Sequence, residues 1–280
     1  MAIDNFIPEV WAGQILVNLR ATHVAANVVN RNYEGDISAY GDRVHINNLV
    51  QPTIRDYTKN SDMEAADTLD DAQRSLVIDQ AKYFNFQIDD IDTAQQRPKI
   101  MQEAMNEASH GLADQSDKYL LSLHTDVHAD NQMGEQADPI ALDKDSIYEH
   151  WVHAGMLLDE ANVPRGNRWS IVPPWVHAQM VRSPEFVRST QLGDSTVLNG
   201  MVGQIAGFNI LLSNNVDSTY GEADVIFGYP GAITFAEQIL NVEAYTPELR
   251  FADAVKGLYV YGAKVTRPKG LVVGYFDAVT

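Results

Sequence analysis

Hydrophobic residues recur at steps of three and four in three parts of the chain, and each part is predicted to form a helix. Residues 8–30 hold the first pattern, and Pro8 suits a first helical position. Residues 93–124 hold the longest, with charged and amide side chains on the opposite side. The third covers residues 143–162 and ends before Pro164. The first helix has little sequence nearby to pack against, so it is expected to dock on a distant element or on another chain.

Apolar and polar residues alternate in other parts, which predicts β-strands. Residues 42–58 and 75–88 both alternate, and the polar, acidic stretch 59–74 between them has no strong period. This order predicts an extended hairpin with a long polar tip, and an irregular connection of that length is often functional. The later chain is expected to hold one more short helix, 175–182, and the strands 169–172, 207–212, 224–227, 232–235 and 257–273, the last broken at Pro268. Helices and strands without regular βαβ alternation predict an α+β fold.

Composition removes several classes of protein. The 280 residues are 45% apolar and include no cysteine, which excludes disulfide scaffolds, thiolate zinc sites and cysteine nucleophiles. No apolar run approaches the length of a membrane helix, and the first residues do not resemble a secretory signal. The net charge of −18 disfavours tight binding of nucleic acid, because phosphate binding depends on lysine and arginine.

The charge is distributed unevenly along the chain. Residues 63–92 hold eight acids and two bases, a net charge of −6, whereas residues 246–280 hold three acids and five bases, a net charge of +2. An acidic middle segment and a basic final segment could pair within one molecule or between neighbours. The alternative is a solvated acidic face with no partner.

No stretch of the sequence predicts a catalytic, cofactor-binding or metal-binding residue. The best metal candidate is residues 124–130, where two histidines four positions apart stand beside two aspartates, but a solvated helix end explains them as well. His150 and His153 lie on one face of a predicted helix, and an exposed turn of helix explains them as well as a metal site does. The glycines of residues 200–207 lack the strand–turn–helix order of a nucleotide-binding loop. We therefore expect no cofactor and no enzyme activity.

Nine stretches, in order along nearly the whole chain, carry a resemblance to a known family. They are FIPEVWAGQIL (6–16), VVNRNYEGDISAYGDRVHI (28–46), TIRDYT (53–58), LVIDQAKYFNFQIDDID (76–92), LLDEANVP (157–164), WSIVPPWVHAQM (169–180), GFNILLSNNV (207–216), AITFAEQI (232–239) and FADAVKGLYVYGAKVTRP (251–268). Together they resemble the major capsid proteins of tailed bacteriophages, which share the Hong Kong 97 fold. In particular, they resemble the coat-protein branch typified by short-tailed phages.

The resemblance implies a division of the chain into five parts. These are an N-terminal arm and helix (1–41), an extended E-loop hairpin with its return strand (42–92), a peripheral domain with a spine helix (93–142), an axial domain (143–245), and closing strands of the peripheral domain (246–280). The E-loop is expected to reach over a neighbouring subunit.

The resemblance also implies a function. It predicts a structural protein that assembles with itself, as pentamers and hexamers, into an icosahedral shell around double-stranded DNA. The shell would form in the host cytoplasm and remain in the virion, with DNA enclosed but not specifically bound and with no membrane partner. The resemblance begins at Phe6, so we expect no fused scaffolding segment but a separate scaffolding protein, together with a portal. Two alternatives stay open: an encapsulin-like cellular compartment and a soluble α+β enzyme.

The same resemblance suggests where subunits meet. Acidic residues of the hairpin tip are predicted to contact basic residues of the closing strands in a neighbour. Lys59 also lies at the tip, but no surrounding motif supports a covalent cross-link there. The predicted inter-subunit residues are Lys59, Glu64, Asp67, Asp70 and Asp71 on the tip, and Arg250, Lys264 and Arg267 on the closing strands.

Overall fold

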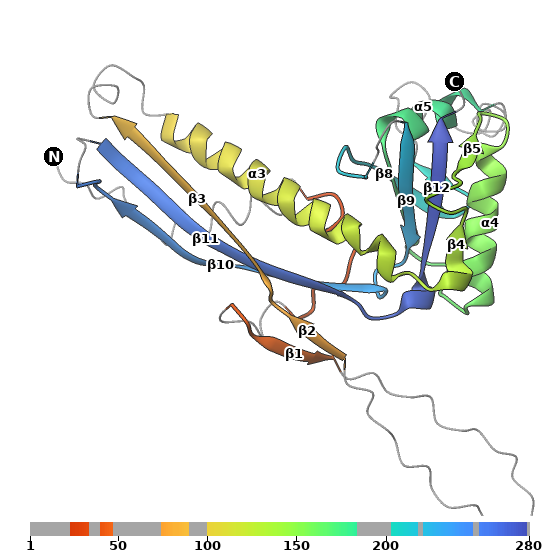
Figure 1. Cartoon of the computed structure of the whole chain (residues 1–280), viewed down its shortest axis with the longest axis horizontal. Helices are drawn as coiled ribbons and strands as arrows, with labels where there is room; N and C mark the ends of the chain where they lie inside the picture. Colours follow the sequence, from red (N-terminus) through yellow and green to blue (C-terminus); the bar gives the residue numbers. More distant parts are fainter. Residues whose placement is uncertain are drawn as a thin grey trace, which may run out of the picture.

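Two β-sheets lie at opposite ends of an elongated molecule (Figure 1). We call the three-stranded one the long sheet and the seven-stranded one the broad sheet. The computed structural model describes residues 23–33, 40–46, 74–89, 100–183, 203–217, 221–248 and 252–278.

The long sheet is antiparallel, with strand order β10-β11-β3. Helix α3 lies along one of its faces (Figure 1), where its Met105 packs in a small buried cluster with residues of β10 and β11. Among the described residues, no helix is long and apolar enough to cross a membrane. The long sheet and its helix consist of α3 (Ile100–Ser122), β3 (Gln80–Asp89), β10 (Ile233–Tyr245) and β11 (Ala252–Val265).

A short hairpin covers part of the other face of the long sheet. Strands β1 (Arg43–Ile46) and β2 (Arg74–Val77) pair antiparallel, as the alternating pattern predicts. Their apolar side chains form a buried cluster with residues of β10 and β11. Gly262 of β11 permits the close approach, because a Cβ at that position would lie 2.3 Å from the Val77 carbonyl oxygen. The predicted strand residues 47–58 and the hairpin tip fall outside the described residues.

The broad sheet mixes parallel and antiparallel pairs in the order β4-β12-β9-β6-β8-β7, with β5 also paired to β12. Helices α4 and α5 belong to the same end of the molecule (Figure 1). The bounds are β4 (Gln132–Met133), β5 (Ile140–Leu142), α4 (Ile147–Glu160), β6 (Trp169–Val172), α5 (Pro174–Arg182), β7 (Gln204–Ile205), β8 (Phe208–Leu212), β9 (Glu222–Gly228) and β12 (Leu271–Ala278).

Aromatic side chains fill the core beside the broad sheet. The Trp151 ring of α4 lies 5.0 Å from the Phe227 ring and 5.9 Å from the Phe276 ring, centroid to centroid. Phe208 completes the group at 5.4 Å from Phe227. All four side chains are fully buried, so this end of the subunit has an apolar core of its own.

The α+β prediction is confirmed, and three element predictions are corrected. The predicted strand 75–88 divides into β2 and β3, which pair in different sheets. Residues 23–30 of the predicted first helix form turns and a bridge to Thr234, while residues 8–22 fall outside the described residues. The amide groups of this segment bond to α3 and the long sheet instead of to a helix of its own. The strand predicted at 232–235 continues to Tyr245, because it pairs along most of β11.

The two sheets do not follow the five predicted parts of the chain. β10 lies in the part predicted as axial, yet it pairs with β11 in the long sheet. β12 lies in the part predicted as closing strands of the peripheral domain, yet it belongs to the broad sheet. The predicted spine helix corresponds to α3, which is followed by a 3-10 turn, Leu123–Asp126. The roles assigned to the five parts remain predictions.

Candidate assembly surfaces

A buried polar cluster attaches the segment 23–33 to the body of the subunit. His23 is inserted between α3 and the long sheet, with Nδ1 3.3 Å from Oδ1 of Asp117 and Nε2 3.0 Å from Oε2 of Glu237. The side chain of His23 is fully buried, as is that of Glu237. Arg31 also donates to Glu237, from the other end of the same segment.

Backbone hydrogen bonds complete this attachment. The amides of Val24 and Ala26 donate to the Asp117 carboxylate over 2.7 and 3.2 Å. Further along, the amide of Asn30 donates to the Ile233 carbonyl over 3.0 Å, which places the segment beside the start of β10. The segment is therefore fixed at both ends, to a helix and to a strand.

The cluster holds its charges in a stable arrangement. Burial alone would lower the pKa of His23, but the hydrogen bonds and charges of Asp117 and Glu237 outweigh it and raise that pKa to about 9. Burial opposes ionisation of Glu237 too, yet His23 and Arg31 lower its pKa overall. His23 is thus a cation at neutral pH, paired with two carboxylates.

Most of the predicted inter-subunit residues lie outside the described part of the chain. This applies to the whole group on the hairpin tip and to one residue of the closing strands: Lys59, Glu64, Asp67, Asp70, Asp71 and Arg250. The structure therefore places two of the predicted residues, Lys264 and Arg267. What it adds for the hairpin is the position of its base, which is packed against the long sheet.

Lys264 lies near the end of β11 with a partner in its own chain. Its Nζ is 3.6 Å from Oδ2 of Asp126, in the 3-10 turn after α3. The two side chains are 48% and 43% exposed, so this ion pair is open to solvent and weak. Lys264 remains accessible to a neighbouring copy.

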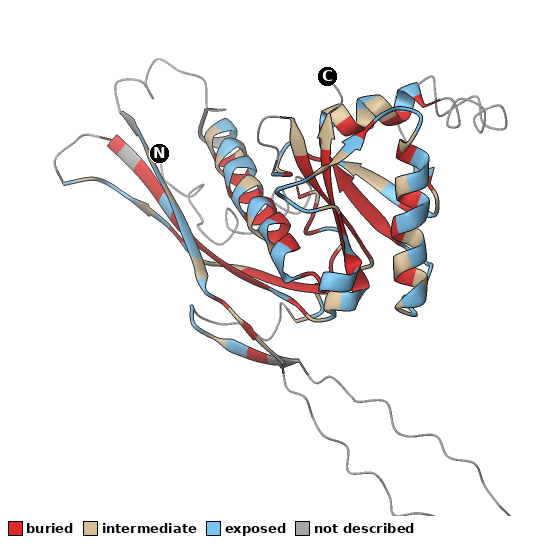
Figure 2. Ribbon diagram, turned by 45° about the vertical axis from the view of Figure 1, so that its right-hand side comes forward, coloured by how far each residue is buried: buried red, intermediate tan, exposed pale blue. Residues whose placement is uncertain are grey.

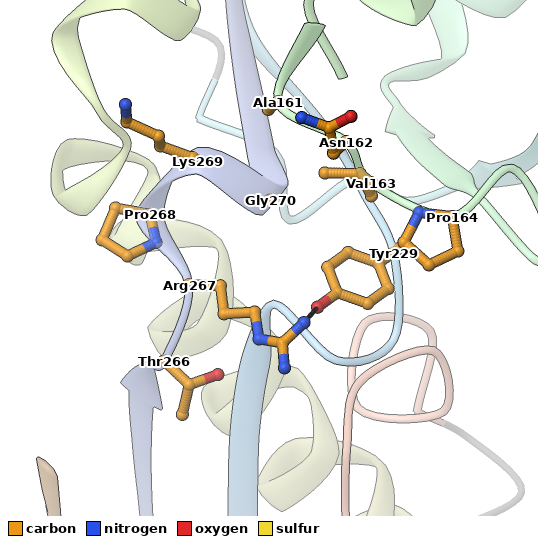
Figure 3. Close-up of a pocket in the computed structure, with 10 residues that line it drawn as sticks. All are labelled: Ala161, Asn162, Val163, Pro164, Tyr229, Thr266, Arg267, Pro268, Lys269 and Gly270. Carbon is orange, nitrogen blue, oxygen red and sulfur yellow. Dashed lines mark hydrogen bonds between the residues drawn. The ribbon is translucent and has the colours of Figure 1, made fainter. Parts of the chain in front are cut away.

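Arg267 lines a hollow at the junction of the two sheets. Its Nη1 donates a 2.8 Å hydrogen bond to Oη of Tyr229 (Figure 3). The hollow has a volume of about 290 Å³ and is formed by the turn after α4, by Tyr229, and by the connection from β11 to β12. In that connection, the Thr266 amide donates to the Ala232 carbonyl over 2.9 Å. This bond joins the two chain crossings between the sheets, which are the segment from β9 to β10 and the segment from β11 to β12.

The histidines of the metal candidate point to separate partners. Nε2 of His124 lies 3.2 Å from Oδ2 of Asp224, on β9, whereas Nδ1 of His128 lies 3.3 Å from Oδ2 of the exposed Asp130. Across the described ranges, no group of three or more histidine and carboxylate side chains could hold a metal ion. His124 instead links the end of α3 to the broad sheet.

The buried cluster around His23 is not among the sites predicted from the sequence. Its members are far apart in the chain, because Asp117 lies 94 positions after His23 and Glu237 lies 214 positions after it. A signal was nevertheless present. Asp117 lies on the apolar side of α3, four residues after Ala113. Glu237 lies among apolar residues on the buried face of β10. Carboxylates at such positions need a buried partner.

Comparisons with known proteins converge on one family. The family described as "Phage capsid protein" matches residues 51–274. A solved structure from Mycobacterium phage Che8 is 32% identical in sequence, with a TM-score of 0.72 over 91% of this chain and 90% of that chain. A search of curated proteins found no match.

More distant structures share the fold. The capsid of the cyanophage P-SCSP1u is 14% identical, with a TM-score of 0.68 over 90% of this chain and 86% of that chain. A virus-like particle from Pyrococcus furiosus is 12% identical, with a TM-score of 0.60 over 97% of this chain and 100% of that chain. At these identities the likeness concerns the fold alone, which is of the Hong Kong 97 type.

Proposed function

Because this chain belongs to the family of phage capsid proteins and forms the shell of the virion, we propose that it builds that shell from rings of five and six copies, each reaching over a neighbour with the hairpin that starts at β1 and β2. The protein is structural and not an enzyme. The shell is icosahedral and encloses double-stranded DNA.

The observation that carries this proposal is the anchored base of the hairpin. Ile46 of β1 pairs with Arg74 of β2, so residues 47–73 leave and return at one fixed point. Val44, Leu76 and Ile78 are buried against the long sheet. A long polar connection on a rigid base gains nothing for an isolated subunit, because its ordering costs conformational entropy. It is useful where a neighbouring copy supplies the contacts.

The charges favour a contact between the tip and the closing strands of a neighbour. Glu64, Asp67, Asp70 and Asp71 belong to a segment of net charge −6, and Lys264 is half-exposed beside a weak partner. Each exposed pair contributes about 0–1 kcal/mol, and the shell repeats the contact in every subunit. Arg267 would join this contact at the cost of its hydrogen bond to Tyr229.

The remaining features are proposed on the resemblance. The resemblance assigns residues 93–142 and 246–280 to the peripheral domain and residues 143–245 to the axial domain. Because β10 pairs in the long sheet and β12 in the broad sheet, our proposal exchanges these two strands, with the long sheet and α3 as the peripheral domain and the broad sheet as the axial domain. The protein belongs to the branch typified by short-tailed phages, on the nine stretches alone. A separate scaffolding protein and a portal take part in assembly, and the net charge of −18 leaves the enclosed DNA mobile.

The test is to delete residues 59–73, which leaves β2 intact, and to follow shell assembly by negative-stain electron microscopy and size-exclusion chromatography. We expect a soluble subunit with unchanged circular dichroism that forms no stable shell, even when it is produced with its scaffold. A matched control keeps the length of the hairpin and replaces Glu64, Asp67, Asp70 and Asp71 with the corresponding amides. It shows whether assembly depends on the charge of the tip or on the length of the hairpin. Normal particles from the deletion variant would contradict the proposal that the hairpin reaches over a neighbouring copy and holds it in the shell.

A further inference from the structure

The outer side of α4 carries a row of apolar residues. Tyr148, Val152 and Met156 are spaced four residues apart, so they lie on one face of the helix. Their exposures are 42%, 47% and 46%, while Trp151 and Leu158 on the opposite face are fully buried in the core. Figure 1 shows that α4 lies on the outside of the broad sheet. Three large apolar residues in a row are more than scattered surface exposure.

Acidic residues border this row. Asp145 precedes the helix, Glu149 lies in its first turn and Glu160 ends it, and all three are exposed. A surface that covers the row must therefore be apolar at its centre and positively charged at its edge, because an unpaired carboxylate is costly to bury.

Helix α5 of the same chain offers a surface with the opposite properties. Its exposed residues are Pro174, Ala178, Val181 and Arg182, while Val176 and Met180 are buried on its inner side. Pro174 and Ala178 are small, Val181 adds an apolar side chain that is 38% exposed, and Arg182 supplies a positive charge at the C-terminal end. Within the described part of the chain, Arg182 has no ion-pair partner.

We propose that the exposed face of α4 in one copy packs against the exposed face of α5 in the next copy around each ring. The large residues Tyr148, Val152 and Met156 fit beside the small Ala178 as ridges fit into grooves. The acidic border of α4 then faces Arg182. Such a contact is heterologous, since it joins two different surfaces of identical chains, and heterologous contacts that close generate rings.

A second copy of this chain is the occupant that the observations favour. The two faces match in size, with large residues on one and small residues on the other, and in the sign of their charge. Both are present in every copy, so each subunit supplies one face to each of its two ring neighbours. The inference rests on the proposed assembly into rings, and it names the surfaces by which the rings close.

The absence of cysteine from the chain permits a direct test. The double variant Val152→Cys with Ala178→Cys would be assembled and oxidised, then separated on a non-reducing denaturing gel. We expect a ladder of covalent oligomers that ends at five or six chains and collapses to the monomer on reduction. The matched control is Val152→Cys with Gln115→Cys, since Gln115 is exposed on α3; it should remain monomeric.

Each other outcome has a defined meaning. Normal shells without a ladder would overturn this contact and leave the proposed assembly intact. A covalent dimer from Val152→Cys alone would also overturn it, because it would show that two α4 helices meet. A compact, cross-linked monomer would mean that the two faces meet within one copy, again against the inference. Failure of the unaltered chain with its scaffold to form rings or shells would contradict the proposed function itself.

A second variant tests the contact without a cross-link. Val152→Asp places a charge in the centre of the apolar row, and Gln115→Asp adds the same charge on α3. We expect Val152→Asp to lower the yield of shells at least tenfold while the unassembled subunit keeps its urea midpoint. Gln115→Asp should assemble normally. Equal yields from the two variants would overturn the contact.

Discussion

The two sheets of this subunit are stabilised in different ways. The broad sheet packs aromatic side chains into an apolar core, and its strands β6, β9 and β12 are almost entirely buried. The long sheet has α3 on one face, and among the described residues its other face is covered where β1, β2 and Tyr33 pack against it. Beyond that hairpin, Tyr83 of β3 is 79% exposed and Leu258, its partner across the pair, is 37% exposed. Figure 2 shows the same contrast in its colours.

The contrast indicates that the two ends have different tasks. The strands of the broad sheet can keep their arrangement without a neighbour, because their aromatic core is buried within the subunit. The long sheet depends on specific polar contacts, above all the cluster of His23, Asp117 and Glu237 that binds the segment 23–33. An element that binds other chains needs exposed surface. The long sheet leaves the strands themselves open at Tyr83 and Leu258, whereas at the broad-sheet end the exposed apolar residues lie on the outer helices.

The largest expected effect tests the core of the broad sheet. Trp151→Ala removes a fully buried side chain that contacts Phe227 and Phe276, and should lower the free energy of unfolding by about 3–5 kcal/mol. Tyr83→Ala, on the open face of the long sheet, should change it by about 0.5 kcal/mol or less. Urea unfolding of the unassembled subunit measures both. Equal losses would remove the distinction between the sheets.

The next effect concerns the polar cluster and depends on pH. Since the pKa of His23 is raised to about 9 in the folded state, its contribution is fully present below its unfolded pKa of about 6.5 and is lost as pH rises through 9. The groups facing its ring are Asp117 and Ser116 of α3 and Glu237 of β10. We expect the free energy of unfolding to fall by on the order of 3 kcal/mol between pH 6.5 and pH 9.5.

The variant His23→Gln is the control for that prediction. It should be less stable at pH 6.5, because Asp117 and Glu237 lose their cationic partner, and its stability should vary little up to pH 9.5. The comparison requires urea unfolding at several pH values for both proteins. A parallel decline in the two would assign the pH dependence to other groups.

The smallest effect is expected at the junction. Lys264→Ala removes a half-exposed ion pair with Asp126, so the free energy of unfolding should change by about 0–1 kcal/mol. Shell stability should fall more than subunit stability if Lys264 meets the hairpin tip of a neighbour. Thermal disruption of assembled particles, followed by light scattering, measures that difference. No difference between variant and unaltered shells would exclude Lys264 from the contact.

Much of the fold is predictable where the pattern is local. The helical spacing of α4 identifies that helix, and the alternation over residues 75–88 identifies extended chain there, although it does not show where β2 ends and β3 begins. The first predicted helix fails over residues 23–30 for a reason that spacing cannot reveal. Its amides bond to Asp117 of α3, which lies more than 90 positions away.

The assembly surfaces are less accessible to sequence reasoning. Acidic and basic segments can be counted, which led to Lys264 and Arg267, but counting does not reveal that each has a partner in its own chain. The row of Tyr148, Val152 and Met156 belongs to a helix that is apolar around much of its circumference. Only the burial of the opposite face shows which of its apolar residues are left exposed.

The junction at Tyr229 and Arg267 has a mechanical consequence. Two chain crossings connect the sheets there, and they are bonded to each other through Thr266 and Ala232. β11 continues from this point for 14 residues, or about 46 Å at ~3.3 Å per residue. A rotation of about 5° at the junction would therefore displace the far end of the strand by about 4 Å. The subunit would act as a lever, in which a small local adjustment changes how far the long sheet reaches toward a neighbouring copy in the shell.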